Sequence, residues 1–152
     1  MLVDMAERSL SDSPFLDPTT AVQCIDRLHD ALRQLAVRVI PDGHLRDGRG
    51  TVRVIVPTMD WDAYVHLAFD EIRLAGSHSP QVSRRLMAAL HDLIRVAPAE
   101  RRPPLMHQVE KLRQSIREGG RAADDVAFAA APDGVGIGVD ASTPRSSSGD
   151  AG

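Results

Sequence analysis

Apolar residues recur at helical spacing along most of the chain, and breaker residues separate the apolar stripes. The clearest stripe follows Asp17, a residue type that caps helices, and Pro18, which suits a first helical turn. Its apolar positions advance in steps of three and four: Ala21, Ile25, Leu28, Leu32, Leu35 and Val39. This spacing predicts one amphipathic helix, which Pro41 closes.

Further stripes predict four more helical segments. A short amphipathic stretch over residues 2–10 comes first, and it is too short to be stable alone. Asp60 starts a helix that Gly76 ends, and Ser79-Pro80 starts the next one. A segment after Pro98 has four apolar residues at helical spacing: Leu105, Val109, Leu112 and Ile116. In addition, residues 122–131 can form a short alanine-rich helix.

Between Asp42 and Val56 the pattern changes from helical spacing to alternation. Leu45-Arg46 and residues 51–56 flank the turn sequence Asp47-Gly48-Arg49-Gly50, which predicts a β-hairpin. One face of this hairpin carries three valines: Val52, Val54 and Val56. Because a two-stranded hairpin is barely stable alone, we expect its apolar face to pack on the helices.

Together these elements predict a mainly α fold, a bundle of four or five helices with one small β-hairpin at an edge. The helical domain is expected over residues 1–131. Residues 132–152 consist mostly of Gly, Ser, Asp and Pro and offer little to bury, so a disordered C-terminal tail is predicted.

Composition narrows the class of protein further. Aromatic residues make up only 3% of the 152 residues, so the core is built from aliphatic side chains, which favours packed helices over a β-sandwich. The formal net charge of −3 gives no basic footprint for nucleic acid. The single cysteine, Cys24, excludes an internal disulfide, and its apolar helical position predicts a buried thiol.

The membrane signals that a sequence can carry are missing from these residues. No apolar run approaches the roughly 20 residues of a membrane helix. Residues 1–8 lack the basic segment and apolar core of a secretory signal. We therefore expect the chain by itself to be soluble and cytoplasmic.

Four sequence blocks resemble a known family in order and spacing. They are Leu2-Val3-Asp4-Met5-Ala6-Glu7-Arg8-Ser9-Leu10-Ser11, Asp17-Pro18-Thr19-Thr20-Ala21-Val22-Gln23, Leu67-Ala68-Phe69-Asp70-Glu71-Ile72-Arg73 and Ser79-Pro80-Gln81-Val82. They resemble the carboxy-terminal soluble region of a bacterial family of predicted membrane proteins, domain of unknown function 2254. The resemblance implies a parent with several amino-terminal transmembrane helices in the plasma membrane, so this chain is expected to be a truncated or detached part. The linker 12–16 departs from the family's Pro-Gly-Ile-Asn pattern.

Two polar groups are candidates for binding a small ligand. Asp17, Thr20 and Gln23 lie at a helix start, where free amides and the helix dipole favour an anion, although Asp17 itself would repel one. Asp70 and Arg73 share a later helix and, at a spacing of three, can also simply pair with each other. A capped helix and a solvated helix face are the alternatives that the residues leave open.

Other chemistry-bearing residues give weaker signals. Asp62, His66 and Asp70 share a helix face without a second set of ligands, so a solvated face with local ion pairs is favoured over a metal site. Ser83, Arg84 and Arg85 are interpreted as a basic helix surface facing solvent. The chain has no phosphate-binding loop or nucleophile elbow. No cofactor, metal or catalytic residue is predicted.

Two functions remain open at this point. The first is a non-enzymatic regulatory or assembly domain of a membrane protein. Because the helix over residues 2–10 needs a longer element or a partner, we expect exposed apolar surface near the amino terminus and self-association of the chain alone. The alternative is a small-ligand or metal-binding domain, weakly catalytic at most, around the two polar groups.

Overall fold

The computed structural model describes residues 1–11, 17–118 and 123–132, and six α-helices and one β-hairpin lie in these ranges. The helices are α1 (Leu2–Ser11), α2 (Pro18–Leu35), α3 (Trp61–Gly76), α4 (Pro80–Val96), α5 (Arg102–Glu118) and α6 (Ala123–Ala130). A 3-10 turn, Ala99–Arg101, precedes α5, and the antiparallel strands β1 (His44–Arg46) and β2 (Val52–Ile55) connect α2 to α3. The predicted fold class is confirmed. The linker 12–16 and residues 133–152 of the predicted tail lie outside the described residues.

Side-chain caps fix where the central helices begin, as the sequence predicts. Asp17 accepts hydrogen bonds from two backbone amides in the first turn of α2, at 3.0 and 3.1 Å. Asp60 and Ser79 cap α3 and α4 in the same way. Pro18 and Pro80 occupy first-turn positions, where a missing N–H costs nothing. These caps satisfy amides that no helical carbonyl can reach.

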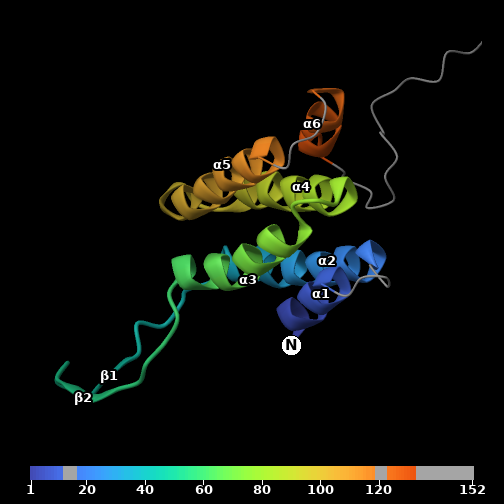
Figure 1. Cartoon of the computed structure of the whole chain (residues 1–152). Coiled ribbons are helices and arrows are strands. Elements are labelled where there is room, and N and C mark those ends of the chain that lie inside the picture. The colour runs from blue at the N-terminus through green and yellow to red at the C-terminus, as the bar shows by residue number, and fades with distance from the viewer. Residues whose placement is uncertain (12–16, 119–122, 133–152) are drawn as a thin grey trace, which may run out of the picture.

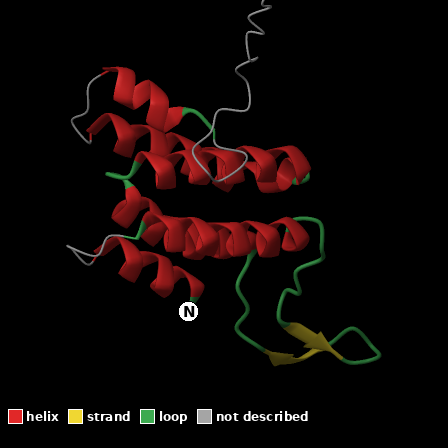
Figure 2. Ribbon diagram, turned by 90° about the vertical axis from the view of Figure 1, so that its right-hand side faces the viewer, coloured by secondary structure: helices red, strands yellow, loops and turns green. Residues whose placement is uncertain are grey.

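The helices form two layers with the core between them. One layer holds α1, α2 and α3, and the other holds α4, α5 and α6 (Figures 1 and 2). Helix α4 contacts α2, α3, α5 and α6, and α3 also contacts α5. The core is aliphatic, as the scarcity of aromatic residues predicts. Its largest fully buried apolar side chains are Ile25, Ile72, Leu86, Met87, Leu90, Leu93, Leu105, Leu112, Ile116 and Val65.

Helix α2 ends earlier than its apolar stripe predicts. Its last residue is Leu35, and Val39 is 92% exposed, so the prediction that Val39 extends the buried stripe is wrong. Arg101 binds the end of the helix. Its guanidinium donates to the carbonyls of Leu35 and Ala36, both at 2.9 Å. The last carbonyls of a helix lack helical partners, and a cation is favourable at that negative end.

Residues 37–59, which we call the arm, project away from the helices (Figures 1 and 2). The strands pair with each other, and Leu45, Val54 and Ile55 are 58%, 50% and 68% exposed. The prediction that the hairpin packs its apolar face on the helices is therefore wrong. Ala36 and Trp61, which flank the arm, are buried in the helical core, so the core closes before the arm begins.

Gly76 lies where α1, α3 and α4 meet. A Cβ at this position would lie 2.4 Å from Cγ1 of Val82 and 3.4 Å from a methyl carbon of Leu10. Gly76 ends α3 as predicted, but it is not among the glycines with positive φ. Its contribution is therefore the close approach of three helices, and not a left-handed cap.

Gly76→Ala is expected to destabilise the fold by about 1–3 kcal/mol, because the added methyl group overpacks this junction. The better helix propensity of alanine offsets at most about 1 kcal/mol of that loss. Denaturant unfolding followed by circular dichroism measures the change. Gly48→Ala is the matched control, since a Cβ there meets no atom within 4 Å. Equal stability of the Gly76→Ala variant and the wild type would contradict the close packing.

Candidate functional site

The structure places the five predicted binding residues in two separate environments. Thr20 and Gln23 line a hollow of about 420 Å³ between α1 and α2. Asp17 stands at the start of α2, while Asp70 and Arg73 lie on α3 and bind partners on α5. Among the described residues, no hydrogen bond or ion pair joins the α2 group to the α3 pair. The structure thus offers two polar sites in place of one.

The group on α2 is organised as a helix cap. Hydrogen bonds from the side chain and the backbone of Thr20, and from the amide of Thr19, lower the pKa of Asp17. The carboxylate therefore already supplies the negative charge that the positive end of the helix dipole favours. Cys24, which lines the same hollow, is 4% exposed, and burial raises the pKa of its thiol. The predicted burial of Cys24 is confirmed.

Asp70 is the centre of a polar cluster between α3 and α5. Its carboxylate accepts a hydrogen bond from Nε2 of Gln108 at 2.8 Å and lies 3.0 Å from Nδ1 of His66. Arg73 and Lys111 lie 3.7 and 3.9 Å from it. Burial raises the pKa of Asp70, but these hydrogen bonds and the charge of Lys111 lower it overall. The predicted pairing of Asp70 with Arg73 is therefore one part of a larger cluster.

Two atoms of this cluster keep unused hydrogen-bonding capacity. Nε of Arg73 and Oε1 of Gln108 are buried and have no hydrogen-bond partner in the described part of the chain. An unsatisfied buried polar atom is unfavourable, so another polar group would be stabilised there. Asp62, the third residue of the predicted acidic face, is exposed. Across residues 1–11, 17–118 and 123–132, no three His, Cys, Asp or Glu side chains form a group that could hold a metal ion.

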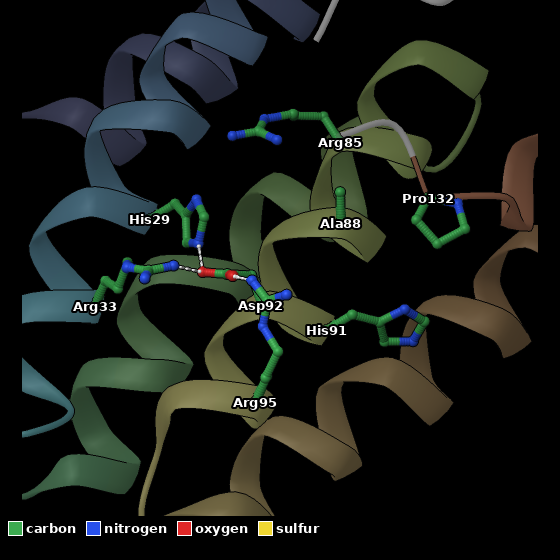
Figure 3. Close-up of a pocket in the computed structure, with 8 residues that line it drawn as sticks. All are labelled: His29, Arg33, Arg85, Ala88, His91, Asp92, Arg95 and Pro132. Atoms are coloured by element: carbon green, nitrogen blue, oxygen red, sulfur yellow. Dashed lines mark hydrogen bonds and ion pairs between the residues drawn. The ribbon is translucent and has the colours of Figure 1, made fainter. Parts of the chain in front are cut away.

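A second polar cluster joins α2 to α4 and was not found by sequence reasoning. Figure 3 shows His29 and Arg33 of α2 meeting one carboxylate oxygen of Asp92 on α4, while Arg95 of α4 meets the other. Nε2 of His29 lies 2.9 Å from the carboxylate, and both arginines donate to it. These side chains line a hollow of about 500 Å³. The residues on α2 and α4 are about 60 positions apart, so no local spacing predicts this cluster.

The α2–α4 cluster holds two helices together and leaves its carboxylate saturated with donors. Burial would raise the pKa of Asp92, but hydrogen bonds from Arg33, His29 and Arg95 outweigh it and lower the pKa to about 2. Charge-assisted hydrogen bonds of this kind are among the stronger polar contacts in proteins. Because both arginines and the histidine already bind Asp92, the arrangement is a structural ion-pair network.

The prediction that Arg84 lies on a solvent-facing surface is wrong. Arg84 is 2% exposed, and its guanidinium lies over the ring of Phe128, 4.3 Å from the ring centroid. Its Nε also donates to the carbonyl of Ala131 at 3.3 Å. Helix α6 thus covers this part of α4 and compensates the buried charge through a cation–π contact. Ser83 is likewise fully buried.

An apolar groove of about 810 Å³ lies between α1, α2 and α3. Ten of the residues that line it are apolar or aromatic, among them Leu2, Val3, Leu28, Leu35, Tyr64 and Leu67. Leu67 is 57% exposed. Asp4, Glu7 and Glu71 add acidic groups to the lining. The groove includes the first residues of α1, where the sequence predicts exposed apolar surface.

These features define a small helical domain with an apolar groove on one layer and a projecting arm. The chain belongs to the family described as predicted membrane protein (DUF2254), whose model matches residues 1–92. The resemblance found in the sequence is therefore confirmed. The matched residues contain the groove and the whole arm. Within the described ranges, no helix combines the length and the apolar character that crossing a membrane requires.

Relatives with curated sequences carry no functional description. The uncharacterized proteins Rv1290c of Mycobacterium tuberculosis and Mb1321c of Mycobacterium bovis are each 35% identical to this chain over 89 residues. The match covers 59% of this chain and 17% of each relative. The chain thus spans about a sixth of the length of the relatives that it matches. No solved structure matches it.

The α2–α4 cluster makes a specific prediction about pH. The pKa of Asp92 in the folded state, about 2, lies below its ordinary value of 3.8. Its contacts therefore stabilise the fold above pH 4, and this contribution is lost as the pH falls toward 2. Asp92→Asn is expected to lower the free energy of unfolding at neutral pH by about 1–2 kcal/mol, after allowance for the exposed arginines.

Chemical denaturation of the wild type and the variant over a series of pH values measures this difference. The two proteins should converge in stability between pH 4 and pH 2. Asp62→Asn, an exposed carboxylate on α3, is the control and should follow the wild type. A difference between wild type and Asp92→Asn that stays constant down to pH 2 would show that the carboxylate is not stabilised in the way the geometry indicates.

Proposed function

We propose that this chain is a non-enzymatic assembly domain of a bacterial membrane protein, held at the cytoplasmic face of the membrane. The apolar groove between α1, α2 and α3 is the observation that carries the proposal. Contiguous apolar surface of this kind is characteristic of a site that binds another protein segment. The family supplies the membrane setting, since its description is that of a predicted membrane protein.

The occupant that we propose is an apolar helix from the rest of the longer protein. The curated relatives have more than four fifths of their length outside the matched stretch, and the resemblance implies that this part includes transmembrane helices. The groove lies between three helices and its lining is mostly apolar, which suits the apolar face of an amphipathic helix. The lining holds three carboxylates, Asp4, Glu7 and Glu71, against one arginine, Arg38, and this acidic balance favours a helix with basic residues beside its apolar stripe.

Small-ligand binding is the second candidate, and the α3–α5 cluster favours it. Nε of Arg73 and Oε1 of Gln108 are a buried donor and a buried acceptor without a hydrogen-bond partner among the described residues, so each is a point where a polar ligand would be stabilised. Thermal unfolding in the presence of inorganic phosphate, magnesium or nucleotides tests this candidate. A ligand at 100 times its dissociation constant stabilises a protein by about 2.7 kcal/mol, so binding would raise the midpoint measurably.

Leu67→Gln tests the assembly role. The isolated chain is expected to self-associate, because a second copy is then the only partner that can cover the groove. Replacing Leu67 with a polar side chain should shift the protein toward monomer, as measured by sedimentation velocity over a range of concentrations. Leu74→Gln is the matched control, because Leu74 lies on the same helix and is 58% exposed but does not line the groove.

Two outcomes would contradict this role. One is a wild-type chain that stays monomeric at high concentration. The other is equal association of the Leu67→Gln and Leu74→Gln variants, which would place the contact elsewhere.

A further inference from the structure

Exposed apolar side chains are concentrated on the arm, which shares only Arg38 with the lining of the groove used in the proposed assembly role. Thirteen large hydrophobic side chains are exposed among the described residues, and seven of them lie within residues 37–59. These seven are Val37, Val39, Leu45, Val54, Ile55, Val56 and Met59. Val54 and Ile55 are neighbours in β2 and so point to opposite faces of the hairpin. Both faces of the arm are therefore apolar and open to solvent.

The arm also carries the opposite charge to the rest of the chain. It contains four arginines and two aspartates, which gives it a net charge of +2: Arg38, Arg46, Arg49, Arg53, Asp42 and Asp47. Since the whole chain has a net charge of −3, the remaining residues sum to −5. Asp47 is engaged inside the turn, where it accepts from the amides of Arg49 and Thr51 and from Nε of Arg53.

Hydrogen bonds hold the arm together where it leaves the helices. Gly43 has a φ of +74°, and its carbonyl accepts a hydrogen bond from the amide of Val56 at 2.8 Å. The indole N–H of Trp61 donates to the carbonyl of Arg101 at 2.7 Å, while the Arg101 guanidinium binds the end of α2. One residue thus ties both ends of the arm to the helices. The arm and the amino terminus lie toward the same end of the molecule, away from α4, α5 and α6 (Figures 1 and 2).

We infer that the arm docks on an anionic lipid surface. Its apolar side chains enter the headgroup layer, and its arginines bind the lipid phosphates. The open strand edges remain hydrogen-bonded to water at that depth, as they could not in the hydrocarbon core. The −5 charge of the remaining chain is repelled by the same surface, so the domain is oriented with the arm toward the membrane.

A second copy of the chain fits the arm less well than a membrane does. In a symmetric dimer the same patch meets itself, so two arms of charge +2 would face each other. Like charges placed across paired strands are destabilising. A lipid surface of negative charge complements the arginines and covers both apolar faces of the arm at once. The membrane setting of the family is consistent with this partner.

Cosedimentation of the full 152-residue chain with lipid vesicles tests the inference. We expect binding to phosphatidylglycerol vesicles, much weaker binding to phosphatidylcholine vesicles, and a loss of binding as salt is raised. Ile55→Gln should weaken binding several-fold. Arg46→Gln combined with Arg49→Gln should weaken it about 25-fold, since each arginine near an anionic surface contributes about fivefold.

Matched controls come from α5, on the opposite side of the molecule. Met106→Gln removes an apolar side chain that is 59% exposed, and Arg113→Gln with Arg117→Gln removes two exposed arginines. These variants should bind vesicles as the wild type does. Leu67→Gln should also bind normally, which separates lipid docking from assembly through the groove.

Three results would overturn the inference. The first is no binding of the wild type to either kind of vesicle. The second is equal binding by the arm variants and the α5 controls, which would place the lipid contact elsewhere. The third is an arm variant that binds vesicles normally but loses self-association, which would make the arm an interface between copies of the chain.

Discussion

Helix α4 is covered by α2, α3, α5 and α6, and this burial on almost every side is the constraint on which the rest of the structure depends. Only His91 and Arg95 are exposed within the helix. An ordinary surface helix buries one stripe and leaves the opposite face in water. Because α4 must bury both faces, its polar residues need partners from other helices. Arg84 finds Phe128 and Ala131 near α6, and Asp92 finds donors on α2.

The same constraint separates what the sequence could predict from what it could not. Helix caps at Asp17, Asp60 and Ser79 are local, and so are the stripes of three- and four-residue steps, so the helix starts and the core positions follow from short windows of sequence. The residues around Arg84 predict a basic helix surface that faces solvent. Its burial depends on α6, some 40 positions later, and no local pattern contains that contact.

The arm shows a second limit of local patterns. Val39 continues the α2 stripe by spacing, but α2 ends at Leu35, where Arg101, far along the chain, binds its last carbonyls. The alternation over residues 52–56 correctly predicts strands and says nothing about what covers them. The predicted binding residues also have some contacts that are local in sequence and others that come from distant helices. The caps and the pairing of Asp70 with Arg73 were visible locally, while Gln108, which completes the Asp70 cluster, comes from α5.

The arginines of the arm bear on its solubility as well as on its partner. A two-stranded sheet with two open edges and apolar faces is an aggregation hazard, and positive charges on the edges are a common protection against it. Arg46 and Arg53 lie in the two strands. Charges placed only for solubility could have either sign, and most of this chain is acidic. A basic arm on an acidic domain is better explained by a negative partner.

The groove is linked to the two ends of the arm through the helices and Arg101. Both belong to the layer of α1, α2 and α3, and Arg101 joins the end of α2 to the start of α3, at the two ends of the arm. Residues 36–43 and 56–60, which join the hairpin to these helices, are neither helix nor strand, so the hydrogen bonds of Arg101 hold the ends of the arm. In the proposed assembly role, this link would reduce the conformational freedom that is lost when a helix binds in the groove. Preorganisation of that kind strengthens binding without adding contacts.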